Sequence, residues 1–283
     1  MTTLDKRLHA YRDDLADIRL KGQVEAARFV DGTPAQVVTE TAPQRRAPEP
    51  GTQLSSELLF GEAVTVFENA DGVAWVQNQT DGYVGYTDSA ALSGTVHAPT
   101  HRVAAIHTCV YGEPHVRSPG TMPLPICAPV TVIGTKGRYA ELATGGWVPA
   151  QHLAELDDTE NDYVAVAERF MGAPYVWGGR SDRGLDCSAL VQLSLMRCGI
   201  EAPRDSDMQE AGLGSPVSYD GNEDVLQRGD IVFWKGHVGI WIAPERFLHA
   251  NAMDMCVSTA PFHDIVRYIQ ENENQPVSSV RRV

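Results

Sequence analysis

The chain has 283 residues and a mass of 30.8 kDa, a length that predicts two or three domains. It is 43% hydrophobic and 21% charged, which excludes a generally disordered chain and collagen-like repeats. The 37 acidic and 23 basic side chains give a net charge of −14, and so acidic a surface repels nucleic-acid phosphates and anionic lipid headgroups. We therefore expect neither nucleic acid nor a membrane among its partners, and an anionic substrate would need locally placed arginines.

The five cysteines are odd in number and widely spaced, without a CxxC pair, so the sequence predicts neither a disulfide framework nor a zinc site. At least one thiol is therefore expected to be free. Charged residues recur through the first 21 positions and leave no apolar core for a signal peptide. We expect a soluble, cytoplasmic protein with no metal or other cofactor, and the pattern leaves the oligomeric state open.

Residues 1–45 are expected to form an N-terminal extension and a linker. The apolar residues of the first 30 positions are spaced among charges in a weak amphipathic pattern, which predicts one or two short helices packed on a neighbour. The stretch 41–52 holds Pro43, Pro48 and Gly51, a composition typical of a linker.

Two stretches of short β-like runs follow, at 46–96 and 97–156, each divided by turn residues. The first ends in Gly82-Tyr83-Val84-Gly85-Tyr86 and the second in Gly145-Gly146-Trp147-Val148, so an internal duplication is plausible. Both stretches resemble bacterial SH3 domains, which implies two small β-barrels. In such barrels the aromatic residues of these motifs more often form core than ligand contacts.

Residues 157–283 begin with a helical pattern up to Phe170, and Gly184-Leu185-Asp186-Cys187-Ser188 then leads into a second, mostly apolar helix. Asp186 stands at the N-cap position, which places Cys187 in the first turn, where free N–H groups favour a thiolate. Burial and the carboxylate of Asp186 have the opposite effect on the thiol. A lone cysteine is commonly a small core residue, but this position favours a nucleophile.

A base for the thiol is expected in a run of three strands, 231–234, 237–242 and 247–251. Two residues that lie opposite each other in an antiparallel pair of strands point to the same face of the sheet, and side chains alternate along each strand. Because 237 and 249 are both odd, His237 and His249 share a face only if the residue numbers of each opposed pair add up to an even number. A four-residue loop excludes this pairing, whereas a three- or five-residue loop, or a bulge, allows it. Asn251, on the same face as His249, is the alternative partner for His237.

Over residues 158–283 the chain resembles the NlpC-type family of papain-like cell-wall cysteine peptidases. The resemblance rests on motifs that occur in order: Tyr175, Trp177-Gly178-Gly179, Asp186-Cys187-Ser188, Pro203-Arg204-Asp205-Ser206, Gly229-Asp230, His237-Val238-Gly239 and His249-Ala250. It implies an α+β papain-like domain, here preceded by the two SH3-like barrels. With such barrels the chain looks like a γ-D-glutamyl-L-diamino-acid endopeptidase, which cuts muropeptides that carry a free N-terminal L-Ala.

Residue by residue, the resemblance makes Cys187 the nucleophile, His237 the base and His249 the third member of the triad. Tyr175 is placed to help the oxyanion. It implies that Asp186, Ser188 and Ser206 line the specificity pocket, and that Glu62 and Tyr83 close this pocket over the substrate's amine. Arg204 or Arg180 would meet the substrate's carboxylates.

The expected partner is therefore a murein peptide recovered during wall turnover, and which diamino acid is preferred stays open. Three other functions are weighed against this one. A non-catalytic cell-wall peptide-binding module is disfavoured by the intact Cys, His, His set. A papain-like amidase or acyltransferase stays open, because it shares the triad chemistry. A zinc enzyme is disfavoured because the two histidines lack a third ligand at typical spacing.

Overall fold

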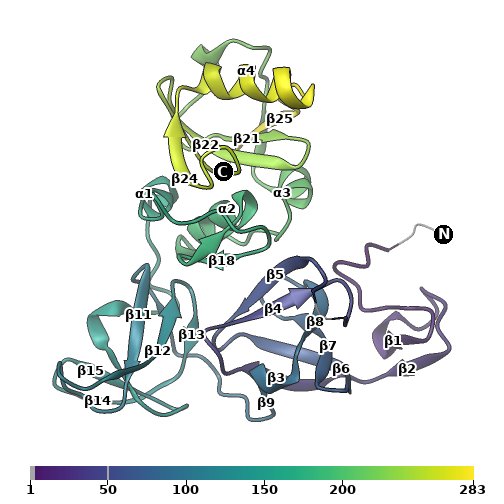
Figure 1. Ribbon diagram of the computed structural model, residues 1–283, viewed down its shortest axis with the longest axis vertical. Coiled ribbons are helices and arrows are strands. Elements are labelled where there is room, and N and C mark those ends of the chain that lie inside the picture. Colours follow the sequence, from purple (N-terminus) through teal and green to yellow (C-terminus); the bar gives the residue numbers. More distant parts are fainter. Residues whose placement is uncertain (1–3, 50) are drawn as a thin grey trace. The chain divides into compact units, whose positions relative to one another are not determined.

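The computed structural model describes residues 4–49 and 51–283, and its chain divides into two compact units, 1–156 and 157–283. Each unit is described by itself (Figure 1). No helix in the described residues is both long enough and apolar enough to cross a membrane.

The first part of unit 1 is a seven-stranded sheet with the order β5-β4-β8-β7-β6-β3-β9. Its core is an apolar cluster that includes Val37, Leu58, Val64 and Val76. The strands are β3 (Thr33–Val37), β4 (Thr41–Arg45), β5 (Leu54–Leu59), β6 (Ala63–Ala70), β7 (Val73–Asn78), β8 (Val84–Asp88) and β9 (Leu92–Ser93), with a 3-10 turn at Ser89–Ala91.

The sequence-based expectation of short helices near the N-terminus is wrong. Residues expected to be helical form the short parallel pair β1 (Leu15–Asp17) and β2 (Arg28–Val30), joined through a 3-10 turn at Ile18–Leu20. The apolar residues do pack on a neighbour, because Leu15 lies in a cluster with Phe67 and Trp75. They do so from extended backbone rather than from a helix.

The stretch expected to be a linker holds β4, which pairs with β5 along its length. Pro43 fits in this strand because β4 pairs with β8 only at Arg45, so the proline's missing N–H removes no ladder bond on that side. The alternation of buried Ala42 and Gln44 with half-buried neighbours is the period of a strand. The first sheet therefore begins well before residue 46.

The second part of unit 1 has its own strands and its own core. A five-stranded sheet has the order β12-β11-β16-β15-β14, and a three-stranded sheet has the order β13-β10-β17. Phe60, just after β5, packs into this second core beside Val103 and Leu124. The strands are β10 (His101–Val103), β11 (His107–Tyr111), β12 (Gly120–Pro125), β13 (Pro129–Val130), β14 (Val132–Lys136), β15 (Tyr139–Leu142), β16 (Trp147–Pro149) and β17 (Leu153–Glu155), with a 3-10 turn at Ala150–His152.

Unit 2 is a mixed α+β domain built on a six-stranded antiparallel sheet with the order β20-β25-β21-β22-β23-β24. Helix α4 (Phe262–Glu273) packs its apolar residues on one face of this sheet, and α2 (Cys187–Arg197) lies against β22 and β23 (Figure 1). The other elements are α1 (Tyr163–Glu168), β18 (Arg180–Ser181), β19 (Gly184–Leu185), α3 (Ser206–Gly212), β20 (Ser215–Val217), a 3-10 turn at Glu223–Val225, β21 (Ile231–Trp234), β22 (His237–Ala243), β23 (Arg246–Asn251), β24 (Cys256–Ala260) and β25 (Ser279–Arg282).

Candidate active site

Cys187 is the first residue of α2, as its position after Asp186 predicts. The helix is buried around most of its circumference, so its first turn is held firmly in the domain, and Cys187 is only 6% exposed. The sulfur accepts a hydrogen bond from the backbone N–H of Val238, the residue next to His237. This bond brings the start of α2 to the start of β22.

The thiol of Cys187 is protonated at neutral pH. Burial raises its pKa to about 12, and the negative charge of Asp186 acts in the same direction, while the N–H groups of Val238 and Ser188 oppose them. The helix terminus therefore does not make Cys187 a resting thiolate, and the site needs a base to remove the proton.

His237 and His249 are the candidates for that base and its partner, and the structure brings them together: Nε2 of His237 lies 2.9 Å from Nδ1 of His249. Trp241 pairs with Phe247 and Ala243 with Arg246, with a bulge between the two pairs. The pair Ala243 and Arg246, next to the turn, has an odd sum of residue numbers. The bulge shifts the register so that the next pair, Trp241 and Phe247, has an even sum, which places both imidazoles on one face of the sheet. This is one of the arrangements that the strand argument allows. Asn251, the alternative partner, instead hydrogen-bonds to Ser258 and Asp254.

Two buried aromatic side chains flank the imidazole pair, and sequence reasoning missed both. Trp234 lies beside His237 at 5.8 Å between ring centroids, and Phe247 lies 5.3 Å from His249. Both are at most 1% exposed. The apolar runs of the two strands carry the only sequence signal for them, and it does not distinguish a site wall from core.

This apolar environment keeps both histidines neutral. Burial lowers the pKa of His237 to about 4 and that of His249 to about 3, the second also through the neighbouring His237. Because Nε2 of His237 is bonded to His249, only its Nδ1 is left to accept a proton from a thiol. Nε2 of His249 is buried and has no hydrogen-bond partner among the described residues.

Asp186 is the centre of a buried polar network. Its carboxylate forms a two-pronged ion pair with Arg204, with Nη1 to Oδ1 at 3.0 Å and Nη2 to Oδ2 at 2.7 Å. It also accepts bonds from the N–H groups of Gly178 and Ala189 and from the hydroxyl of Ser188. These bonds cap α2 and tie the preceding loop to it.

The sequence-based role for the arginines is therefore wrong. The expectation that Arg204 meets a substrate carboxylate does not hold, because Arg204 is completely buried and bonded to Asp186 and to the Ser188 hydroxyl. Arg180 is also fully buried, and its Nε donates to the side chain of Gln192. Arginine is favoured at such sites because its fork matches a carboxylate, and the sequence gives no sign of whether the carboxylate belongs to the protein or to a ligand.

Ser206 begins α3, after the segment that carries Arg204. This segment is fixed to the start of α2 by Gln209, a residue that sequence reasoning missed. The Gln209 amide donates to the carbonyl groups of Ser188 and Pro203, both at 2.9 Å. In the sequence, Gln209 is marked only as a polar residue on the side of a helix that faces the protein interior.

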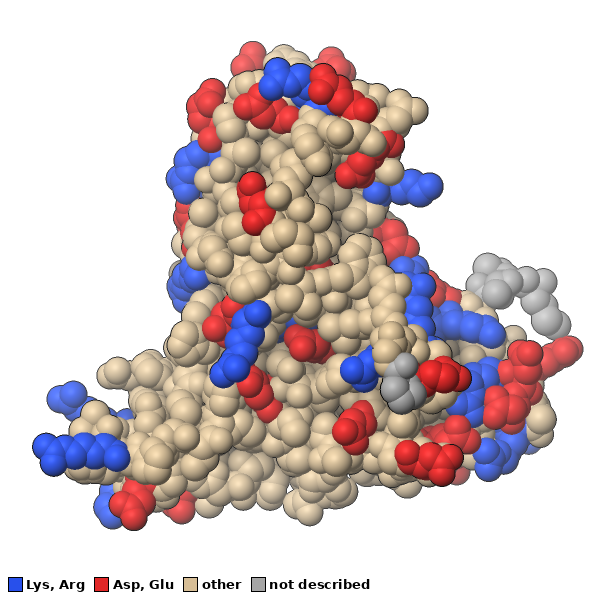
Figure 2. All heavy atoms as spheres, in the orientation of Figure 1, with Lys and Arg blue, Asp and Glu red and all other residues tan. Residues whose placement is uncertain are grey.

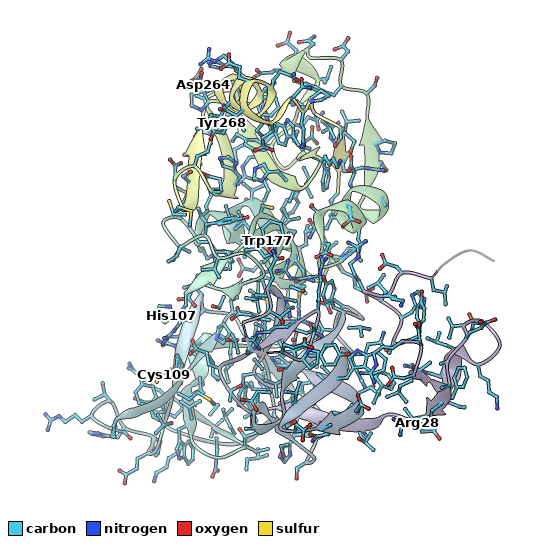
Figure 3. The ribbon with its side chains drawn as sticks, turned by 45° about the vertical axis from the view of Figure 1, so that its right-hand side comes forward. Arg28, His107, Cys109, Trp177, Asp264 and Tyr268 are labelled. Atoms are coloured by element: carbon cyan, nitrogen blue, oxygen red, sulfur yellow. The ribbon has the colours of Figure 1, made fainter. Side chains whose placement is uncertain are left out.

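Tyr175 lies on the loop before β18, with its N–H bonded to the carbonyl of Met255. Burial, and after it the neighbouring Cys187 and Asp186, raise the pKa of Tyr175 well above the usual range, so the phenol keeps its proton and can donate a hydrogen bond near the thiol. Two residues on, Trp177 is 53% exposed, and Figure 3 labels it.

Glu62 and Tyr83 both lie in unit 1. Glu62 is 1% exposed, and its Oε2 accepts bonds from the N–H of Leu59 and the amide of Asn78. Tyr83 is 2% exposed and lines a hollow in the same unit. Their role in substrate binding stays a prediction.

Comparison with known proteins assigns two parts of the chain to known families. Residues 172–273 match the NlpC/P60 family, and residues 45–92 match the bacterial dipeptidyl-peptidase Sh3 domain. The chain is 27% identical over 228 residues to the protein named dipeptidyl-peptidase 6 of Lysinibacillus sphaericus, covering 72% of this chain and 82% of the relative. It is also 27% identical over 229 residues to the gamma-D-glutamyl-L-lysine dipeptidyl-peptidase of Bacillus subtilis, covering 70% and 72%.

The crystal structure of an NlpC/P60 family protein from Bacillus cereus superposes with a TM-score of 0.73 at 19% identity, covering 88% of this chain and 99% of that one. This likeness concerns the fold. With a buried cysteine at a helix start and a paired histidine on the adjacent strand, the protein is a cysteine peptidase. Its catalytic domain belongs to the NlpC/P60 family and follows a bacterial SH3 domain.

Proposed function

We propose that this peptidase hydrolyses the γ-D-glutamyl bond to a diamino acid in cell-wall peptides, with Cys187 as nucleophile and His237 as base. The observation that carries the catalytic part is the 2.9 Å bond between His237 and His249, next to the N–H of Val238 that bonds the Cys187 sulfur. The names of the relatives from Lysinibacillus sphaericus and Bacillus subtilis support the choice of bond and substrate.

The chemistry follows from the protonation states. At neutral pH Cys187 is a thiol and His237 a neutral imidazole. As the sulfur attacks the scissile carbonyl carbon, Nδ1 of His237 takes the thiol proton, and His249 accepts a hydrogen bond from Nε2–H of the resulting imidazolium. Tyr175 donates toward the developing oxyanion. The imidazolium then protonates the leaving amine, and water hydrolyses the thioester through the same base.

We further propose that the substrate has a free N-terminal L-Ala and is a peptide recovered in the cytoplasm during wall turnover. Asp186 directly precedes the nucleophile, and its side chain lies in a polar cluster with Ser188. Since Arg204 already neutralises Asp186, a substrate ammonium would join this ion pair rather than meet an isolated carboxylate.

The test is mass spectrometry of products from L-Ala-γ-D-Glu-diaminopimelate and from its N-acetylmuramoyl form. We expect L-Ala-γ-D-Glu and the free diamino acid from the first substrate and much slower cleavage of the second. Cys187→Ala should abolish hydrolysis, because removing a nucleophile costs several orders of magnitude, and Cys198→Ala is the matched control. Residual activity of the Cys187→Ala variant above about one per cent would contradict the catalytic assignment. Equal cleavage of both substrates would contradict the free-amine preference alone.

A further inference from the structure

Unit 1 contains two hollows that share one wall. The wall is made by Arg12, Trp75 and Tyr86, which line both hollows. The first hollow has a volume of about 490 Å³, and its other charged lining residues are all basic: Lys6, Arg7 and Arg46. The second has a volume of about 390 Å³, and its other charged lining residues are all acidic: Glu49, Glu68 and Asp71. The two hollows therefore differ in the sign of their charge.

The shared wall is rigid. The guanidinium of Arg12 lies 4.5 Å from the centroid of the Trp75 ring and donates to the Tyr86 hydroxyl at 2.8 Å. It also forms ion pairs with Asp14 and Glu68. Because all of these bonds engage one guanidinium, Arg12 acts as a fixed partition rather than as a cation available to a ligand.

The remaining charges divide into paired and unpaired ones. Arg7 is paired with Asp5, and Glu68 is paired with Arg12 and with Arg28, which Figure 3 labels. In the parts of the chain that the structure describes, no ion pair engages the other four, which are Lys6 and Arg46 in the first hollow and Glu49 and Asp71 in the second.

Two cations without an ion pair thus lie on one side of the wall of Arg12, Trp75 and Tyr86, and two carboxylates without an ion pair lie on the other. Figure 2 shows basic and acidic side chains interspersed over the part of unit 1 that holds the N-terminal segment. On a chain with a net charge of −14, unpaired cations beside aromatic side chains form a local exception.

We infer that these two hollows form a binding groove for a short zwitterionic peptide. Its carboxylate end lies at Lys6 and Arg46, its ammonium end lies at Glu49 and Asp71, and its middle crosses the Tyr86 side of the partition. A purely anionic ligand matches only the first hollow, and a purely cationic ligand only the second. Occupation of this groove does not depend on hydrolysis, since all of its lining residues belong to unit 1.

The probe is L-Ala-γ-D-Glu-diaminopimelate, titrated into the full-length Cys187→Ala variant with its tryptophans labelled with ¹⁵N. Trp75 lines both hollows, and Trp234 lies beside His237, so their indole N–H signals report on the two sites separately. Trp75→Phe and Trp234→Phe variants assign these signals.

We expect the Trp75 signal to shift in a saturable manner. Arg46→Ala and Glu49→Ala should each weaken this binding about fivefold, the effect of one exposed ion pair. Arg138→Ala, which removes an exposed arginine outside both hollows, should leave it unchanged. N-acetylation of the probe should weaken binding in the parent protein and have little effect in Glu49→Ala.

An unmoved Trp75 signal overturns the inference, as does an N-acetylated probe that binds as well as the free one, since the N-terminal ammonium would then contribute nothing to binding in the groove. Failure of the proposed activity has a different signature. It appears as intact peptide in the wild-type reaction or as an unmoved Trp234 signal, whatever happens at Trp75.

Discussion

Gly239 and His249 lie so close that no side chain fits between their strands. A β-carbon placed on Gly239 would lie 2.9 Å from the β-carbon of His249 and 2.5 Å from Cζ of Phe247. Both neighbours are at most 1% exposed, so neither has room to withdraw. The glycine therefore sets the position of His249, the residue that we propose orients the base.

Gly239→Ala is expected to displace His249 and to lower kcat by about tenfold or more, because small misplacements at a catalytic group are costly. Gly212→Ala is the matched control, since a β-carbon there meets nothing within 4 Å. It should leave kcat unchanged and slightly favour the helix. Steady-state kinetics together with urea unfolding separates the two effects, and a Gly239→Ala enzyme with wild-type kcat would contradict the assignment.

The pH dependence of catalysis should reflect a neutral resting pair. Because the pKa of Cys187 is raised to about 12 and that of His237 lowered to about 4, the thiol and the neutral imidazole coexist between these values. We expect kcat/KM to stay high down to about pH 5 and to fall as pH approaches 4. Ultraviolet absorbance at 240 nm should detect no Cys187 thiolate at pH 7, with Cys187→Ala as the reference. A thiolate signal at neutral pH would show a preformed ion pair instead.

Acid should destabilise the catalytic unit through the two histidines. Their pKa values are about 4 and about 3 in the folded protein, below the ordinary value of 6.5, so the unfolded chain binds more protons between these limits. The two histidines therefore make their full contribution to the free energy of unfolding above about pH 6.5, and this contribution decreases as pH falls toward 4. Replacing His249 by Asn removes one of these groups and should flatten the decrease. Urea unfolding at pH 7 and pH 5 measures it, and equal slopes for the two proteins would contradict the argument.

His249→Asn should also keep more activity than His249→Ala. An asparagine side chain retains an oxygen that can accept from Nε2 of His237, whereas alanine leaves this buried nitrogen without a partner. We expect the ratio of the two kcat values to be about tenfold, which a difference of one hydrogen bond to a charged imidazolium explains. Similar kcat values for both variants would show that His249 does not orient the base.

Removing one partner of the ion pair between Asp186 and Arg204 should lower the free energy of unfolding more than removing both charges. Arg204→Met leaves a carboxylate buried without its cation, which costs about 3–5 kcal/mol of unfolding free energy. The double variant Asp186→Asn, Arg204→Met removes both charges and should recover part of this loss. A thermodynamic cycle from chemical denaturation gives the coupling, and strict additivity would mean that the two side chains act independently.

The sequence predicted the elements that carry Cys187, His237 and His249 well because their signals are local. An N-cap aspartate followed by an apolar run fixes the start of α2, and the strand pattern limits the turns that can place His237 and His249 on one face. It could not predict that Arg204 binds Asp186, because the pairing joins residues 18 positions apart and most charges of these types are exposed. It also missed β4, since Pro43 resembles a linker residue until its unpaired strand edge is known.

The bulge between Trp241 and Ala243 bears on how this hairpin can change in length. At the present length, a regular pairing that begins at Ala243 and Arg246 would turn the two imidazoles to opposite faces. Deleting Ile242 shortens β22 by one residue and makes the bulge unnecessary, so the histidines would still meet. A natural variant with one residue fewer here can therefore keep an intact histidine pair. The number of residues between the two histidines is thus a poor guide to which variants are active.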